Sequence, residues 1–180
     1  MIRTLIVGIA LFLIFAVMFA PASLIRRVLP TSADVELLTP TGTLWNGAAE
    51  LYLGGQSAGR LHWDFDAVTI LQGMAGYDVQ LTGPEHTLSG TVAAGIDAAT
   101  ARLDGQAQAA FVNRWLAPYD IAIDGALSMT GVDLRLPYDA PVAGAAGGSV
   151  RWAGGPVRYR LGGRSHAGDL PPLVAYLGEG

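Results

Sequence analysis

The sequence predicts a mainly β protein, in which one N-terminal transmembrane helix precedes an antiparallel, curved β-sheet of the meander or half-barrel kind with one or two short helices. Three observations predict this fold class. Residues 5–25 form an uncharged apolar run, hydrophobic side chains recur at every second position after residue 40, and 24 glycines and 10 prolines punctuate the 180 residues. A period of two is typical of strands that bury one face of a sheet.

The N-terminal segment has the length of a membrane span. About 20 helical residues, at a rise of 1.5 Å each, cross the roughly 30 Å hydrocarbon core of a bilayer. Arg3 flanks one end of the run from Leu5 to Ile25, and Arg26 and Arg27 flank the other. These charges leave the orientation nearly balanced, and the very short N-terminal tail favours a cytoplasmic N-terminus.

A cleaved signal peptide is the alternative for this segment. Ala20-Pro21-Ala22 has the small-x-small form of a cleavage site, and the run from Leu5 to Phe19 would serve as its apolar region. The apolar residues Leu24 and Ile25 and the arginine pair that follows favour an uncleaved anchor. Both interpretations export the remainder of the chain. We expect a tail and anchor over 1–27, a juxtamembrane linker over 28–40 and a periplasmic β domain over 41–180 of a bacterial inner-membrane protein.

Alternating segments predict about seven to nine strands of ordinary length. Leu61, Trp63 and Phe65 share one face of a strand, whereas Arg60, His62 and Asp64 share the other. Other strands are predicted around Leu51 and Leu53, Tyr77 to Leu81, Leu88 to Val92, Ala99 to Leu103, Ile121 to Ile123 and Leu127 to Leu136. The last pair is predicted as Ser149 to Ala153 and Pro156 to Leu161.

Glycine-containing dipeptides predict the turns between these strands. Gly83-Pro84, Asp104-Gly105, Asp124-Gly125 and Gly154-Gly155 each end a strand or join a hairpin, and Gly131 shifts the alternation as a β-bulge does. Short helices are predicted over Asp66 to Met74 and Ala107 to Leu116, the second with Phe111 and Trp115 on one face. Ala140 to Gly148 is predicted as a loop and the tail after Asp169 as irregular.

Composition argues against several classes of function. The chain has no Cys, so disulfides and thiolate metal sites are excluded. The formal net charge is −4 and all 11 basic residues are Arg, scattered along the sequence. Nucleic-acid binding requires a clustered basic surface. The absence of Lys also excludes a Walker A phosphate loop at the glycine-rich Gly144 to Gly148.

No motif in the sequence predicts an enzyme. Gly55-Gln56-Ser57-Ala58-Gly59 matches a nucleophile elbow, but that motif requires a strand-to-helix turn and strand patterns lie on both sides. His62, His86 and His166 lack zinc-ligand spacing. Asp64 and Asp66 are expected on a solvated face, the Asp residues at 104, 124 and 133 in turns, and the four Trp in the core rather than in a ligand groove. We therefore predict no catalytic, cofactor-binding or metal-binding residues and no cofactor.

The chain resembles the family of protein N of the type II secretion system, also called the general secretion pathway. The resemblance rests, after the apolar segment, on Thr41 to Ala49, Gly59 to Trp63, Gly148 to Tyr159 and Leu170-Pro171-Pro172-Leu173 in that order. It implies an accessory inner-membrane component in a Gram-negative bacterium that supports export of folded proteins from the periplasm through contacts with other secretion subunits. Family members are not enzymes, and the resemblance assigns no functional residues.

One departure from the family leads to a further expectation. Family chains generally continue with more β sequence, whereas this sequence ends at Gly180, so we expect a smaller sheet or an edge left for a partner strand. The alternative function is a membrane-anchored periplasmic module that binds or transfers lipid in a β groove. A hydrolase built on Ser57 is the third hypothesis. The expected partners are subunits of the inner-membrane platform or periplasmic parts, and inner-membrane lipid, without nucleic acid.

Overall fold

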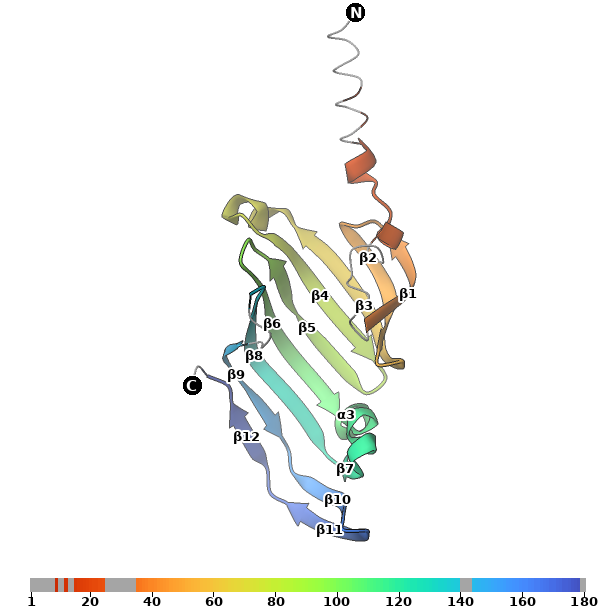
Figure 1. The fold of residues 1–180 in the computed structure, drawn as a ribbon, viewed down its shortest axis with the longest axis vertical. Helices are drawn as coiled ribbons and strands as arrows, with labels where there is room; N and C mark the ends of the chain where they lie inside the picture. Colours follow the sequence, from red (N-terminus) through yellow and green to blue (C-terminus); the bar gives the residue numbers. More distant parts are fainter. Residues whose placement is uncertain (1–8, 10–11, 13–14, 25–34, 140–143, 179–180) are drawn as a thin grey trace, which may run out of the picture. The chain divides into compact units, whose positions relative to one another are not determined.

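The computed structural model describes residues 9, 12, 15–24, 35–139 and 144–178. The chain divides into two compact units, residues 1–65 (unit 1) and 66–180 (unit 2), and each is described by itself. The ribbon in Figure 1 labels the main elements. Strands dominate both units and their pairing is antiparallel throughout, so the predicted mainly β class is confirmed.

Unit 1 is a three-stranded antiparallel meander preceded by the short 3₁₀ helix η1 (Ala22–Leu24). Its strands are β1 (Val35–Gly42), β2 (Asn46–Leu53) and β3 (Gln56–Asp66), of which the last residue already belongs to unit 2. Ala49 pairs with Leu61 and Gly47 with Trp63, on the face opposite His62. The predicted alternation of β3 is therefore confirmed. Strand β1 begins at Val35 and thus includes part of the range 28–40 expected as a linker.

The predicted membrane segment lies partly outside the described residues. Phe15 to Met18 are helical, and the described apolar side chains between Ile9 and Phe19 are exposed. Within the described part of the chain, no helix combines the length and hydropathy that crossing a membrane requires. The anchor and the domain boundaries stay predictions.

Unit 2 contains one large and one small antiparallel sheet. Along the large sheet the strand order is β4 (Ala75–Gly83), β5 (His86–Ala94), β6 (Ala98–Gln108), β8 (Ala126–Pro137), β9 (Gly144–Trp152) and β12 (Leu173–Tyr176). The small sheet has the order β11 (Arg164–Leu170), β10 (Gly155–Leu161) and β7 (Ile121–Ile123). In the described residues the large sheet remains open, because β4 and β12 do not pair with each other.

Three short helices complete unit 2, and two of them were predicted. The 3₁₀ helix η2 (Ala67–Gln72) lies in the predicted range 66–74, and α3 (Ala109–Leu116) lies in the range 107–116. The 3₁₀ turn η3 (Ala117–Tyr119) follows α3 directly, with Pro118 near its start. Proline lacks the amide hydrogen that a continuing α-helix needs, so α3 ends before it.

The β-bulge predicted at Gly131 is confirmed. Gly131 has a φ of 54°, and β8 shifts register at this point against both β6 and β9. The Asp104 carboxylate accepts a hydrogen bond from the Gly131 amide at 2.7 Å and so stabilises the bulge. Opposite it, a Cβ on Gly148 would stand 2.4 Å from the Gly131 carbonyl oxygen, so only glycine fits there.

Several predicted turns are wrong. Asp104-Gly105 lies within β6, at the register shift against β8, and does not close the strand. Asp124-Gly125 does not join a hairpin, because β7 pairs with β10 in the small sheet while β8 pairs with β6 and β9 in the large one. Gly105 lies at a register shift, and Gly125 lies where the chain passes from the small sheet to the large one. Neither glycine belongs to a two-residue hairpin loop.

The C-terminal third also differs from the prediction. Gly154-Gly155 does not join a strand pair, because β9 pairs with β8 and β12, and β10 pairs with β7 and β11. Residues 144–148, predicted as loop, belong to β9, whereas 140–143 lie outside the described residues. The tail predicted as irregular forms the end of β11 and strand β12. The strands number twelve in the described residues, above the seven to nine expected.

Candidate functional site: the apolar face of the large sheet

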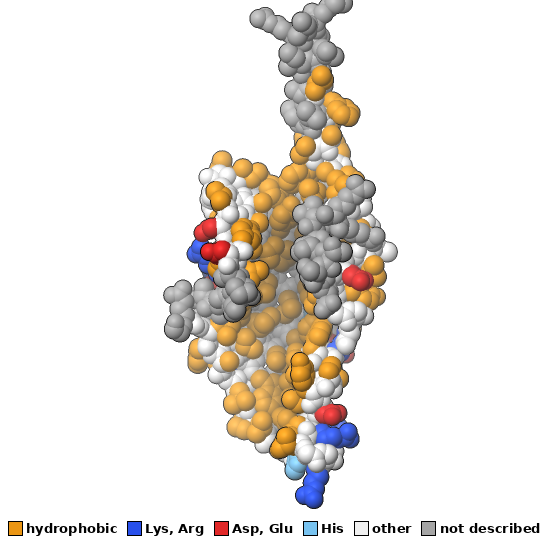
Figure 2. Space-filling model, viewed as in Figure 1, with side chains coloured by type: hydrophobic (Ala, Val, Ile, Leu, Met, Phe, Trp, Pro, Cys, Tyr) orange, Lys and Arg blue, Asp and Glu red, His pale blue; other side chains and the backbone are white. Residues whose placement is uncertain are grey.

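One face of the large sheet of unit 2 is apolar in successive strands. Cross-strand pairing places Tyr77 beside Val92, Val92 beside Ala101, and Ala101 beside Leu134. Two residues further along each strand, a second row contains Val79, Gly90, Leu103 and Val132. Side chains of one strand alternate between faces, so all these residues point to the same side. Figure 2 shows hydrophobic side chains gathered over the strands of this unit.

The opposite face of the same sheet is polar. The row formed by Asp78, Thr91, Arg102 and Asp133 alternates with the apolar row, and an ion pair joins Arg102 to Asp133 at 3.8 Å. This polar face needs no cover, because water solvates it. The apolar face would be expected to carry a second layer, as sheets of globular domains normally do.

Within unit 2, the described residues place no second layer over most of the apolar face. Tyr77, Val92 and Leu134 are only half-buried, and Leu136 is 46% exposed. No large side chain in the described residues is fully buried. The sheet thus presents apolar area to its surroundings beyond what single scattered surface residues would give.

A shallow cavity of about 420 Å³ lies on this face. Tyr77, Val92, Ala101, Leu134 and Leu136 line it, together with small side chains of β4, β5 and β6. Burial among these neighbours raises the pKa of the Tyr77 phenol above its ordinary value of 10.0. The lining offers no carboxylate, imidazole or amine, so the cavity suits a hydrocarbon group rather than a polar substrate.

Helix α3 covers one end of the apolar face. Phe111 packs on the buried His86, with ring centroids 3.9 Å apart, and Trp115 meets Phe111 edge-on at 4.7 Å. The Asn113 side chain fixes the helix to β7, donating to the Ile123 carbonyl at 2.8 Å and accepting from the Ile123 amide at 2.9 Å. Aromatic rings therefore close this end.

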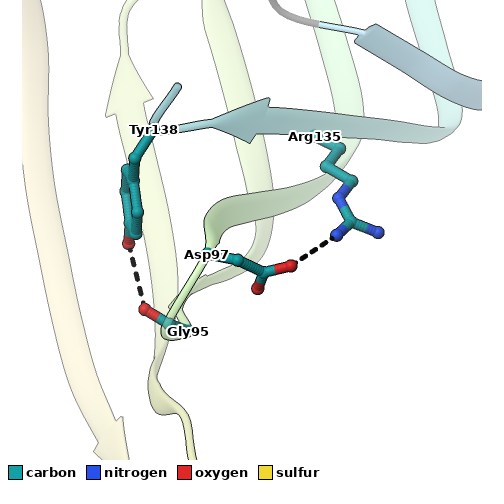
Figure 3. Close-up of polar contacts among 4 residues, drawn as sticks. All are labelled: Gly95, Asp97, Arg135 and Tyr138. Atoms are coloured by element: carbon teal, nitrogen blue, oxygen red, sulfur yellow. Dashed lines mark hydrogen bonds and ion pairs between the residues drawn. The ribbon is translucent and has the colours of Figure 1, made fainter. Parts of the chain in front are cut away.

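The other end of the face is bounded by the turn between β5 and β6. The Tyr138 hydroxyl donates to the Gly95 carbonyl at 3.3 Å, and Arg135 pairs with Asp97 at 3.1 Å (Figure 3). Asp97 is largely exposed, so this ion pair contributes little to stability. The two contacts fix the turn beside the end of β8 without covering the cavity.

The residues weighed as catalytic candidates lie on different elements. Ser57 is in β3, opposite Tyr52, in a strand that follows the hairpin turn at Gly54-Gly55. The strand-to-helix context of a nucleophile elbow is therefore missing there. His62 is exposed on β3, His86 is buried under α3, and His166 is exposed on β11, stacked on Tyr159 at 5.2 Å. In the part of the chain that is described, no group of three or more His, Asp or Glu is placed to hold a metal ion.

The carboxylates of Asp66, Asp104 and Asp133 have structural partners. Asp66 caps η2 by accepting from the Val68 amide at 2.9 Å, and Asp64 is exposed on β3. Asp104 stabilises the bulge and Asp133 pairs with Arg102. The Asp124 carbonyl accepts from the indole of Trp152 at 2.8 Å. None of these contacts forms a carboxylate pair.

The tryptophans contact residues of their own unit. Trp63 and Trp152 are buried, and the Trp63 indole donates to the Thr43 carbonyl at 3.2 Å. The Trp45 indole donates to the Val17 carbonyl at 2.8 Å, and the Leu44 amide donates to the Ala20 carbonyl at 2.8 Å. The segment Thr41 to Ala49 thus binds the end of the N-terminal helix, a contact between distant residues that periodicity cannot predict.

Within the described residues, the fold and this face define a class: an antiparallel β protein that presents an apolar sheet face without a second layer, together with open strand edges. The family of "Type II secretion system (T2SS), protein N" matches residues 33–175. The chain belongs to this family, which confirms the resemblance predicted from the sequence.

A relative supports the same assignment. The type II secretion system protein N of Vibrio cholerae serotype O1 is 28% identical over 152 residues, which cover 81% of this chain and 60% of that protein. The chain therefore spans less than two thirds of the length of this relative. No solved structure matches the chain.

Proposed function

We propose that the chain is an accessory component of the type II secretion system that is anchored in the inner membrane and acts from the periplasm through protein–protein contacts, without catalysis. The family match over residues 33–175 carries this proposal. The apolar run from Leu5 to Ile25 supports the anchor, because its described side chains, such as Phe12 and Phe19, point outward with 70% and 66% of their surface exposed.

The free edge of β12 is the docking element that we propose for another subunit. In the described residues β12 pairs on one side only, with β9. The Leu177 amide donates to the Gly148 carbonyl of β9, so the amides of Ala175 and Leu173 face the same way. The amides of Val174 and Tyr176 then point to the open edge, where a partner strand would bind them.

A proline substitution tests this edge directly. Val174→Pro removes one outward N–H group and leaves the ladder with β9 intact, because proline is tolerated at edge positions whose amide faces solvent. Val174→Thr is the matched control and keeps the amide. We expect Val174→Pro to lower co-purification of secretion-platform subunits from detergent-solubilised membranes, and Val174→Thr to behave like the unaltered chain. Equal recovery of platform subunits by all three proteins would reject the edge as the docking element.

The membrane topology is tested separately. A reporter enzyme that is active only in the periplasm, fused after Gly180, is expected to be active, and the protein is expected to resist alkaline extraction from membranes. The intact mass of the purified protein distinguishes an uncleaved anchor from cleavage after the Ala20-Pro21-Ala22 site. A cytosolic reporter signal would overturn the proposed location.

The apolar face, which no second layer of described residues covers, favours a second candidate function, that of a lipid-binding module. The cavity beside Tyr77 and Leu134 is lined by apolar and small side chains, and a hydrocarbon chain there gains about 0.8 kcal/mol for each CH₂ group buried. Native mass spectrometry of the full chain is expected to show co-purified phospholipid. Leu134→Gln is expected to reduce it, whereas Asp133→Asn on the opposite face is not. Lipid-free spectra of the unaltered protein would remove this candidate.

A further inference from the structure

An apolar rim stands at the open end of the large sheet. It consists of Val68, Ile70 and Leu71 of η2 and Ile96 of the turn between β5 and β6. Leu71 is 88% and Ile96 is 92% exposed, and Val68 and Ile70 are exposed by more than half. Large apolar side chains rarely project this far from turns of a soluble domain, because each leaves most of its hydrocarbon in water.

The two elements of the rim lie together in unit 2. Ala75, just after η2, pairs with Ala94, just before the turn, and the Met74 side chain lies 3.8 Å from where a Cβ on Gly95 would stand. Figure 1 shows the short helix before β4 and the turn joining β5 to β6 at the same end of the sheet. The rim therefore borders the cavity that Ala75, Ala94 and Leu136 line.

Several backbone groups in and beside the rim have partners within the same segments. The Val68 amide donates to the Asp66 carboxylate at 2.9 Å, the Gly73 amide to the Ile70 carbonyl at 2.9 Å, and the Met74 amide to the Thr69 carbonyl at 3.0 Å. In the turn, the Gly95 amide donates to the Ala98 carbonyl at 2.9 Å. Backbone groups that keep internal partners can leave water without the cost of breaking hydrogen bonds.

The residues behind the rim have the character of a bilayer interface. Residues 67–77 carry no charge. Tyr138 and Arg135 stand just behind the turn and contact Gly95 and Asp97 (Figure 3). Tyr is enriched at the level of lipid headgroups, and Arg reaches that level through its long side chain. A protein partner would need directional bonds around an apolar centre, whereas Val68, Ile70, Leu71 and Ile96 have no polar side-chain atoms to make them.

We infer that this rim inserts into the surface of a lipid bilayer, with Val68, Ile70, Leu71 and Ile96 among the acyl chains and Tyr138 and Arg135 at headgroup level. Such shallow insertion reaches about 5–10 Å into the boundary between headgroups and acyl chains. The open end of the apolar face then lies against lipid. This inference goes beyond the proposed secretion role, since it needs no other subunit.

The experiment uses the full chain in vesicles of pure phospholipid. The natural sequence has no Cys, so a single cysteine takes an environment-sensitive fluorophore at one position only. Leu71→Cys and Ile96→Cys report on the rim, and Ser89→Cys, exposed on the polar face of β5, is the matched control. Far-UV circular dichroism verifies the β fold of each labelled protein.

In vesicles, both rim probes are expected to emit at a shorter wavelength than the same fluorophore exposed to detergent-free buffer. They are also expected to lose fluorescence intensity when the vesicles include lipids that carry a shallow spin label. The probe at position 89 is expected to show neither change. The inference is overturned if either rim probe behaves like the probe at position 89, or if the rim probes respond only after other secretion subunits are added. Because secretion is not measured, failure here leaves the secretion proposal standing on its own tests.

Discussion

At the scale of single residues, the segment Thr41 to Ala49 shows why certain positions accept only glycine. Thr43 accepts hydrogen bonds from the amides of Trp45 and Asn46 through its hydroxyl oxygen and makes a tight turn between β1 and β2. Gly47 follows this turn, and its missing side chain leaves room for the Trp63 ring. A Cβ there would stand 2.5 Å from both that ring and the Thr41 carbonyl oxygen.

The first prediction concerns this close contact. Gly47→Ala is expected to lower the free energy of unfolding by about 1–3 kcal/mol, because the added methyl group overpacks a buried tryptophan. Chemical denaturation measures the change. Gly168→Ala is the control, since no atom lies within 4 Å of a Cβ at that position. Equal stability of the two variants would contradict the packing argument.

Tyr77 gives a prediction about pH. Burial favours the neutral phenol and raises the pKa of Tyr77 in the folded state above 10.0. The folded chain therefore holds this proton more tightly than the unfolded chain, and the contribution to stability is lost as pH rises above 10. Tyrosinate absorbance at high pH is expected to show a late phase that Tyr77→Phe removes. Tyr119→Phe, at a position 72% exposed, serves as the control and is expected to leave that late phase in place.

At the scale of elements, the Asn113 side chain links helix α3 to strand β7. Its side chain supplies both partners of the Ile123 backbone, so removing it leaves a half-buried donor and acceptor without their partner. Asn113→Ala is expected to cost about 1–3 kcal/mol of stability and to speed amide hydrogen exchange in residues 121–123. Gln80→Ala, exposed on the polar face of β4, is expected to change neither quantity. Unchanged exchange in β7 would show that Asn113 does not hold the helix.

The elements also show what the sequence could and could not predict. Period-two alternation predicted the strands around Tyr77, Leu88 and Trp63, because the face of a residue depends only on its own strand. Which strands pair with one another was harder to predict from the sequence. Gly154-Gly155 and Asp124-Gly125 have hairpin composition, yet each connects strands of different sheets. Gly125 is required because a Cβ would stand 2.5 Å from the Gly154 carbonyl oxygen, a contact between residues far apart in sequence.

The site was predictable only in part. The apolar face follows from the same alternation that predicted the strands, whereas its lack of cover does not, because alternation is identical in a buried and an open sheet. The rim was equally hidden. Val68, Ile70 and Leu71 belong to a stretch predicted only as a short helix, and their exposure depends on how η2 is capped by Asp66 and Gly73. Their residue types are those of an ordinary core, and only their positions in the folded structure show that these side chains are exposed.

At the scale of the whole molecule, the apolar face that no second layer of described residues covers allows stability and function to be tested at separate positions. Leu136 lies on that face and is 46% exposed, so the folded state withdraws only part of its side chain from water. Val132, on the same strand and next to the bulge at Gly131, is 5% exposed. The two positions therefore differ in what a polar substitution costs, although both carry branched apolar side chains on one face of β8.

The last prediction uses this pair. Leu136→Gln is expected to change the free energy of unfolding by less than about 1 kcal/mol, as substitutions at partly exposed positions usually do, whereas Val132→Thr is expected to cost more because it places a hydroxyl where no water reaches. If the face acts by contact with lipid or with another subunit, the order reverses in a functional assay. Leu136→Gln then reduces co-purified lipid or export of a secreted protein in cells, while the folded fraction of Val132→Thr retains both. Should Leu136→Gln unfold the protein as readily as Val132→Thr, the face would be part of the folding core, and its exposure would not mark a binding surface.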